Sequence, residues 1–163
     1  MIIAPYLAPF PQNRYGNEPF TGSVWATPNE NYFLHADTVL QACKDSGMVM
    51  ILSPVYLGFG GNGWATSVDT SDSTELREWG RFLGNRYKNL NRTIWMLGGD
   101  TDPTSRKAKM RAVADGISEH DPRCLYTSRD EPETYASTHW TGEWWQTLNH
   151  YYTYTTTSYT FGQ

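Results

Sequence analysis

The sequence is poor in several features that mark whole classes of protein. Cysteine occurs twice among 163 residues, at Cys43 and Cys124. This pair has neither the spacing of a metal site nor the density of a disulfide-stabilised domain, so we expect two small, buried apolar side chains. Lys and Arg number 13 against 17 Asp and Glu and form no basic run, although nucleic-acid binding requires clustered cations. No apolar stretch approaches the roughly 18 residues of a membrane span. Neither nucleic acid nor membrane is therefore a predicted partner.

Several catalytic motifs are also missing. The glycine-rich stretch from Gly58 to Trp64 is not followed by the Lys and Ser or Thr of a phosphate-binding loop, and no glycine-rich turn joins a strand to a helix. There is no G-x-S-x-G nucleophile motif. No two histidines have the spacing of metal ligands. We expect neither a cofactor nor a catalytic metal, and we interpret the stretch from Gly58 as a mobile loop that displays Trp64.

Aromatic residues, by contrast, are abundant. They make up 15% of the chain, with 7 Trp, 11 Tyr and 6 Phe. One explanation is a large aromatic core. The other is a sugar-binding site, in which flat rings stack on the apolar faces of sugars while polar neighbours bind the hydroxyl groups. Composition does not decide between them, so the position of each aromatic residue must.

Short apolar runs alternate with amphipathic segments along the chain. Thr27 to Glu30 and Asp72 to Glu75 have the pattern of capping boxes that open helices, and Gly47 has the position of a helix C-cap. A third helix is expected after Asp102-Pro103, with Asp102 as its cap. Continuous apolar runs predict buried strands over residues 1–7, 48–52, 93–97, 124–127 and 148–152.

Alternating strands and helices predict an α/β fold with a parallel sheet. An open doubly wound sheet and a closed (β/α)₈ barrel compete. The long loops all follow strands, as they do at the active-site face of a barrel, and the dinucleotide fingerprint of the open sheet is absent. A complete barrel has about 250 residues. We therefore expect residues 1–163 to form one partial barrel domain, truncated at both ends, with roughly strands two to six.

Asp100 is the best candidate for a catalytic carboxylate. It follows a buried strand directly, where barrel enzymes place catalytic groups. Gly98 and Gly99 before it would let the backbone turn and leave space for a ligand. A carboxyl group crowded by aromatic rings could serve as a general acid. The alternative is that Asp100 caps the next helix.

A glycosidase usually needs a second carboxylate. Glu131 and Glu143 lie in loops on the expected face, although such residues are more often simply solvated. Asn149 and His150 belong to the last predicted strand, where they would bond either to the protein or to ligand hydroxyl groups. The predicted substrate-binding residues are Tyr6, Tyr56, Trp64, Trp140, Asn149 and Tyr152.

Five stretches together resemble the apiosidase-like glycoside hydrolases. The most specific runs from Trp79 to Tyr87 (WGRFLGNRY) into Ile94 to Asp100 (IWMLGGD). The others are residues 15–20 (YGNEPF), residues 27–33 (TPNENYF) with Ala36-Asp37, and residues 148–154 (LNHYYTY). The resemblance extends over nearly the whole chain.

This resemblance implies a retaining (β/α)₈ hydrolase that acts on plant cell-wall glycans, with apiose in pectin side chains as the known substrate type. Asp100 matches the family's acid/base aspartate. The family's nucleophile is a glutamate on a later strand, and no residue before Gln163 matches it, so the expected nucleophile lies beyond the C-terminus and this chain alone is expected to be inactive. Ser128-Arg129 departs from the pattern, which has a His-containing segment there.

Two further functions remain open at this stage. A non-catalytic carbohydrate-binding remnant of a barrel would use the same aromatic residues without a second carboxylate. A barrel lyase or isomerase would usually need a metal, a phosphate site or a Schiff-base lysine, and none of the predicted strand ends offers one.

Overall fold

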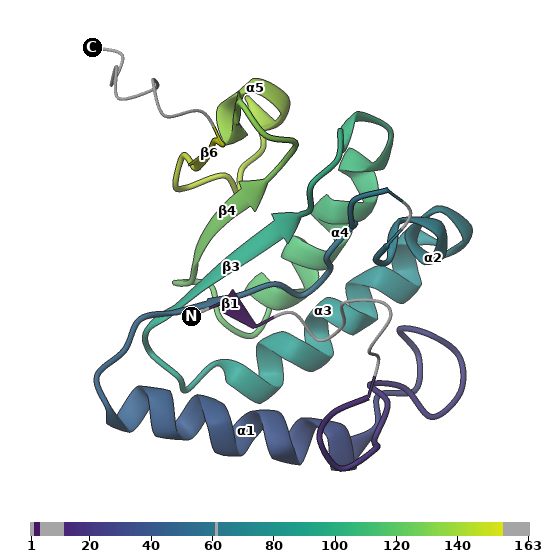
Figure 1. Ribbon diagram of the computed structural model, residues 1–163, viewed down its shortest axis with the longest axis vertical. Coiled ribbons are helices and arrows are strands. Elements are labelled where there is room, and N and C mark those ends of the chain that lie inside the picture. Colours follow the sequence, from purple (N-terminus) through teal and green to yellow (C-terminus); the bar gives the residue numbers. More distant parts are fainter. Residues whose placement is uncertain (1, 4–11, 61, 155–163) are drawn as a thin grey trace.

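The computed structural model describes residues 2–3, 12–60 and 62–154 and contains a parallel sheet flanked by helices (Figure 1). The sheet has the order β1-β2-β3-β4, and each neighbouring pair is parallel. Its strands are β1 (Ile2–Ile3), β2 (Met50–Leu52), β3 (Thr93–Gly98) and β4 (Leu125–Arg129). The predicted α/β class with a parallel sheet is confirmed.

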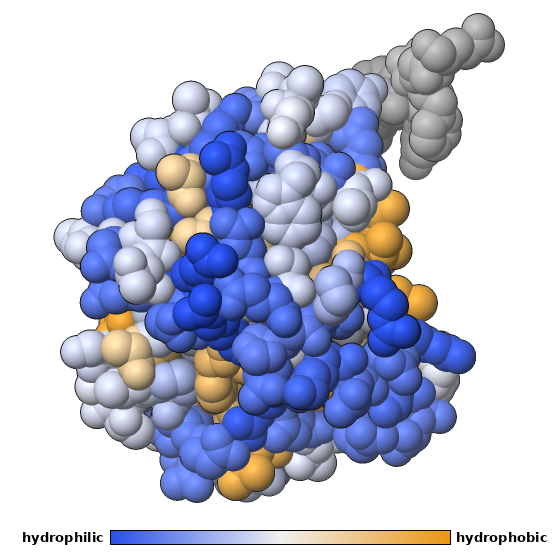
Figure 2. Space-filling view, turned by 180° about the vertical axis from the view of Figure 1, so that it is seen from behind, coloured by the Kyte–Doolittle hydropathy of each residue, from blue (hydrophilic) through white to orange (hydrophobic). Residues whose placement is uncertain are grey.

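Helices connect the successive strands. They are α1 (Glu30–Asp45), α2 (Ala65–Thr70), α3 (Ser73–Tyr87), the 3₁₀ turn η1 (Thr104–Arg106), α4 (Lys107–Ser118) and α5 (Ala136–Trp140). From behind the view of Figure 1, the surface is mostly hydrophilic with small separate apolar patches (Figure 2). Within the described ranges, no helix has the length and apolar character needed to span a bilayer.

The N-cap predicted from the sequence is correct for α3 and wrong for α1. Asp72 forms the predicted capping box with Glu75. The predicted Thr27 cap is wrong, because α1 begins two residues later and Asn29 is its N-cap, accepting a hydrogen bond from the Asn31 backbone N–H. The Thr27 hydroxyl instead donates to the Ser23 carbonyl. Asn is as good a cap as Thr, so the two candidates could not be separated by residue type.

The last predicted strand is corrected by the structure. Residues 148–152 do not form a fifth parallel strand of the sheet. Only β6 (Tyr151–Tyr152) is extended, and it pairs antiparallel with β5 (Thr134–Tyr135). Leu148 lies beside β4, where its N–H donates to the Tyr126 carbonyl and its own carbonyl accepts from the Thr127 hydroxyl. Leu148 is 36% exposed, so this apolar run is neither a strand of the parallel sheet nor a buried segment.

Much of the aromatic content is core. Trp25, Trp64 and Trp79 pack with Phe20 at ring-centroid separations of 5.2 to 5.7 Å. Trp64 is only 9% exposed, so the prediction that a mobile loop displays it is wrong. The side chain that this loop does expose is Phe59, at 67%.

Three glycines bring α3 and α4 into backbone contact. A Cβ atom on Gly80 would lie 2.3 Å from the Val113 carbonyl oxygen, and one on Gly116 would lie 2.1 Å from the Arg77 carbonyl oxygen. Gly84 is similarly close to Ile117. The interface is apolar at its centre, where Leu76, Val113 and Ile117 are buried.

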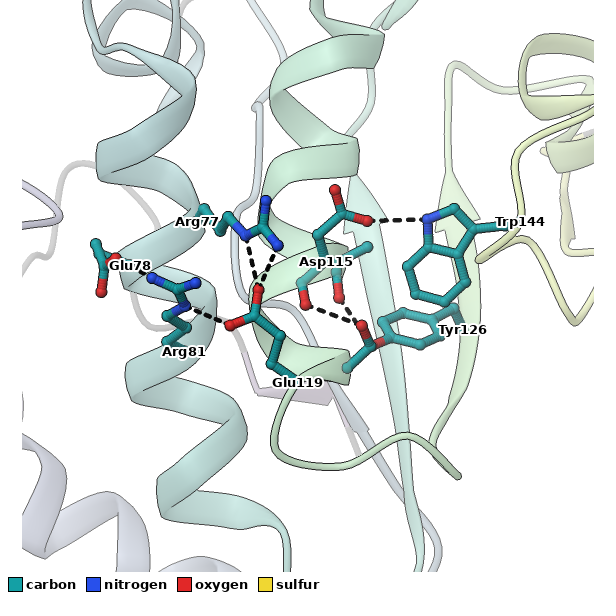
Figure 3. A network of polar contacts seen from close by, with 9 residues as sticks. Arg77, Glu78, Arg81, Asp115, Glu119, Tyr126 and Trp144 are labelled. Carbon is teal, nitrogen blue, oxygen red and sulfur yellow. Dashed lines mark hydrogen bonds and ion pairs between the residues drawn. The ribbon is translucent and has the colours of Figure 1, made fainter.

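Charged side chains border this helix interface (Figure 3). Arg77 and Arg81 of α3 both pair with Glu119, which follows α4. On the other side of α4, the Trp144 indole N–H donates to Asp115 at 3.0 Å, beside the ring of Tyr126 from β4. These contacts link α3, α4, β4 and the loop after α5. Each pair is partly exposed. These contacts therefore mainly fix how the elements are aligned with one another, and they contribute little to the free energy of unfolding.

Both cysteines are free, as expected. Each is partly buried and packs against the core. Burial raises the pKa of the Cys124 thiol to about 11.

Candidate active site

The strands β3 and β4 end side by side, which places the residues that follow them at one edge of the sheet. Gly98 is the register partner of Arg129, and the Gly99 N–H donates to the Arg129 carbonyl. Asp100 follows β3 and Asp130 follows β4. Ligands bind at the carboxyl ends of strands in parallel α/β folds.

The two glycines before Asp100 are required by neighbouring backbone. Gly98 has a φ of +90°, and a Cβ atom there would lie 2.5 Å from the Arg129 carbonyl oxygen. A Cβ atom on Gly99 would lie 2.6 Å from the Leu57 backbone nitrogen. The predicted turn is present, but the expected space for a ligand is filled by the loop after β2 and by the end of β4. The glycines therefore fix the direction of Asp100.

Asp100 is held by one cation and one hydroxyl group. Arg129 Nε lies 2.7 Å from Oδ1 of Asp100, and Arg129 Nη2 donates to Oδ2 at 3.3 Å. The Tyr56 hydroxyl donates to Oδ2 at 3.1 Å. The Asp100 side chain is 14% exposed. Asp100 thus faces other side chains and does not cap the following helix. The Thr104 N–H donates to Asp102 Oδ1, but the N-cap of η1 is Pro103 and that of α4 is Arg106, so Asp102 is not the predicted N-cap.

Tyrosines surround this ion pair. The Arg129 guanidinium lies over the Tyr152 ring, 4.4 Å from its centroid, and the Tyr152 hydroxyl is bonded to the Tyr154 hydroxyl. Burial, together with the charge of Asp100 and the hydrogen bond to it, raises the pKa of Tyr56 to about 12. Tyr56 is therefore a neutral hydrogen-bonding group at physiological pH.

The β5–β6 ribbon brings Tyr152 to this position (Figure 1). Glu133, which has a φ of +66°, ties the ribbon together. Its carboxylate accepts hydrogen bonds from the Tyr151 hydroxyl at 2.9 Å and from the Tyr154 backbone N–H at 3.0 Å.

The structure brings together only part of the predicted substrate-binding set. Tyr56 and Tyr152 lie at the Asp100–Arg129 pair. Trp140 is fully buried and donates its indole N–H to Asp130, and Trp64 belongs to the core described above. The Asn149 side chain accepts a hydrogen bond from the Ser137 backbone N–H. Tyr6 lies outside the described residues.

The two candidate second carboxylates lie in different surroundings. Glu143 forms a two-point ion pair with Arg111 of α4, and its side chain is only 7% exposed. Glu131 follows Asp130 and lies 3.4 Å from His139. His150 is half-buried, and burial followed by the charge of Arg129 lowers its pKa.

Three residues at this edge were not predicted as site residues from the sequence: Arg129, Asp130 and His139. Asp130 is 3% exposed, and its Oδ1 accepts the Trp140 indole N–H at 3.0 Å. Burial raises the pKa of Asp130 to about 6, against the opposing effects of Trp140 and His139. A usable signal was present, since Asp130 follows β4 as Asp100 follows β3.

The raised pKa of Asp130 predicts how the free energy of unfolding depends on pH. Because its pKa is raised in the folded state, the folded protein binds the proton more tightly than the unfolded chain does. Stability from this group is therefore greatest below pH 4 and falls as the pH rises to about 6. At about 1.4 kcal/mol per pKa unit, the buried charge costs roughly 3 kcal/mol above pH 6.

Asp130→Asn keeps the acceptor for Trp140 and removes the charge. We expect the variant to gain stability over the wild type between pH 4 and pH 7, measured by urea unfolding at each pH. The other titrating groups cancel in the difference between the two proteins. A difference that does not change with pH would contradict the assignment of a charged, buried Asp130.

Metal binding has no support among residues 2–3, 12–60 and 62–154, where no group of three or more His, Cys, Asp or Glu is arranged to hold an ion. What the site does offer is a carboxylate, a guanidinium and tyrosine hydroxyl groups at a strand edge. These are groups that exchange protons with, and hydrogen-bond to, a hydroxyl-rich ligand.

Two solved structures have a similar fold. One is described as a glycoside hydrolase family 5 protein from Bacteroides vulgatus ATCC 8482; it has a TM-score of 0.74 and 23% identity over 86% of this chain. The other is described as a glycoside hydrolase, with a TM-score of 0.72 and 22% identity over 85% of this chain. The chain covers 30% and 31% of their lengths, respectively.

Curated protein sequences give no significant match. A sequence model of the apiosidase-like catalytic domain, however, matches residues 2–161. The match includes the β3 strand, Asp100 and the β4 edge described above. The chain therefore belongs to the family of apiosidase-like catalytic domains, with a glycoside-hydrolase-type α/β fold.

Proposed function

We propose that the complete protein is a retaining glycoside hydrolase of plant cell-wall glycans, with Asp100 as its acid/base residue. The position of Asp100 is the observation that carries the proposal. It stands at the carboxyl end of β3, turned by two obligatory glycines towards Arg129 and Tyr56. Family membership supports the reaction class and makes pectin side chains containing apiose the first substrates to test.

The contacts of Asp100 affect the two proton transfers that it would carry out in a retaining mechanism. The ionised carboxylate is the form that would activate water in the second step of a retaining mechanism, and Arg129 Nε lies 2.7 Å from it. In the first step, the same carboxyl group must carry a proton to the leaving oxygen. The Tyr56 hydroxyl, which donates to Oδ2 at 3.1 Å, is the group that would orient Asp100.

The nucleophile in this proposal is a glutamate on another strand of the complete protein. Glu143 is occupied by Arg111, and Glu131 is directed to His139. The solved structures with this fold are about three times as long as the chain. We propose that β1 to β4 are four consecutive strands of a (β/α)₈ barrel and that the chain alone does not catalyse hydrolysis.

The test uses the complete protein and a panel of pectic polysaccharides. We expect release of reducing sugar, with the anomeric configuration of the first product retained when it is followed by proton NMR. Inversion of configuration would contradict the retaining mechanism. Tight binding of pectic oligosaccharides without any product after long incubation would contradict the hydrolase and favour a carbohydrate-binding protein.

A further inference from the structure

A second group of polar side chains lies beside Asp100 at the same sheet edge, and the proposed mechanism does not use it. His139 of α5 stands between two carboxylates that follow β3 and β4. Its Nδ1 is 3.6 Å from Asp102 Oδ1, and its Nε2 is 3.4 Å from Glu131 Oε1. Both separations exceed the usual 2.7–3.2 Å of a hydrogen bond to nitrogen. The imidazole is thus held between two acceptors without a close bond to either.

Buried polar atoms without a hydrogen-bond partner gather in this group. Within the described residues, His139 Nδ1, Glu131 Oε2 and Asp130 Oδ2 have none. Buried polar groups are nearly always hydrogen-bonded, so these three atoms on neighbouring side chains are available to a polar ligand. Asp130 is the strongest case, because only 3% of its surface is exposed. The nearby Ser128 hydroxyl lowers its pKa slightly without a hydrogen bond of normal geometry.

The group is closed on one side and open on the other. The His139 side chain is 13% exposed, whereas that of Asp102 is 63% exposed. α5 is fixed over the end of β4, because Trp140, the next residue after His139, bonds to Asp130 and the Ala136 N–H donates to the His150 carbonyl. A ligand would enter from the Asp102 side and meet an imidazole held in place by its own helix.

The chemistry of the group selects one class of ligand. Three carboxyl groups around the imidazole disfavour an anion. The described residues have no metal-binding arrangement, which removes a divalent cation from consideration. A hydroxyl group both donates to a carboxylate and accepts from an imidazole N–H, so two adjacent hydroxyl groups of a neutral sugar would satisfy both ends of the group.

We infer that Asp102, Glu131 and His139 form a binding subsite for the vicinal hydroxyl groups of a neutral sugar unit next to the glycosidic bond whose leaving oxygen Asp100 protonates. The inference rests on the proposed hydrolase function. It assigns Glu131 and His139 to substrate recognition rather than to proton transfer in the reaction. His139 would donate to one hydroxyl group, and Glu131 would accept from its neighbour.

Glu131→Gln and His139→Gln in the complete protein test the inference, with His120→Gln as the matched control on an exposed histidine in the turn after α4. Kinetics use the pectic oligosaccharide that the wild type cleaves. Each subsite variant should raise KM at least tenfold and change kcat less than threefold, because the lost bonds are made to both the ground state and the transition state. The control should match the wild type.

Binding is measured separately, by calorimetry of the same oligosaccharide with Asp100→Asn protein, alone and combined with each subsite variant. The affinity should fall at least tenfold in the combined variants. Thermally stable variants with unchanged KM and affinity would overturn the subsite. If no protein cleaves any glycan, the hydrolase proposal fails, while the calorimetry still decides whether this group binds sugar.

Discussion

Replacing Asp100 by Asn in the complete protein should lower kcat on a natural glycan by about 10²- to 10⁴-fold, the usual contribution of general acid–base catalysis. The substitution preserves the shape of the side chain and its contact with Tyr56. It removes the proton that the leaving oxygen needs. Substrates with acidic leaving groups, such as aryl glycosides, need little protonation and should lose far less in their first step.

The comparison of leaving groups separates chemistry from folding. A misfolded variant would lose activity on all substrates alike, so the measurement is kcat/KM, which reports the first step, for a natural glycan and for an aryl glycoside of the same sugar. Tyr56→Phe is the matched control, because it removes only one hydrogen bond to Asp100 and should cost much less. Near-normal turnover of the natural glycan by the Asn variant would remove Asp100 from the acid role.

The largest expected effect on stability comes from Gly116→Ala. In an exposed helix, this substitution stabilises a protein by about 1 kcal/mol, because alanine is the better helix former. Here the sign should reverse. The new Cβ would lie 2.1 Å from the Arg77 carbonyl oxygen and 2.8 Å from the Arg81 nitrogen, both backbone atoms of α3. Separating the helices should cost about 3 kcal/mol, at the upper end of overpacking penalties.

Thermal unfolding followed by circular dichroism measures this cost. A loss of about 3 kcal/mol should lower Tm by roughly 6–12 °C in a domain of this size. Gly16→Ala serves as the control, since Gly16 has a φ of +79° but nothing within 4 Å of the added atom. It should show only the smaller cost of backbone strain, about 1–2 kcal/mol. An increase in Tm for Gly116→Ala would show that α3 and α4 do not touch at this point.

Local patterns in the sequence were sufficient for much of the fold. The apolar stripe of α3, with Leu76, Trp79 and Leu83, is buried as its spacing predicts. The apolar runs predicted over 48–52 and 93–97 correspond to β2 (Met50–Leu52) and β3 (Thr93–Gly98). These elements are determined by periodicity and by caps that lie within a few residues. The run at 148–152 was misassigned because an apolar run alone does not distinguish a buried sheet strand from a partly exposed segment beside one.

The candidate site was only partly predictable, because its contacts join distant segments. Asp100 could be found from its place after an apolar strand. Its partner Arg129 could not, since their proximity depends on the register of β3 with β4. His139 reaches the edge only through the fold of α5. Trp64 was assigned to a loop surface because a glycine-rich segment suggests exposure, whereas the turn directs its indole into the core.

The most direct test of the central claim is chemical rescue of the Asp100→Asn protein by azide. An acid/base variant of a retaining enzyme still forms the glycosyl-enzyme from an aryl glycoside, and azide then replaces water without needing a general base. We predict that azide accelerates turnover and that the product is a glycosyl azide with retained configuration by NMR. No rescue, or a glycosyl azide of inverted configuration, would contradict Asp100 as the acid/base residue of a retaining glycosidase.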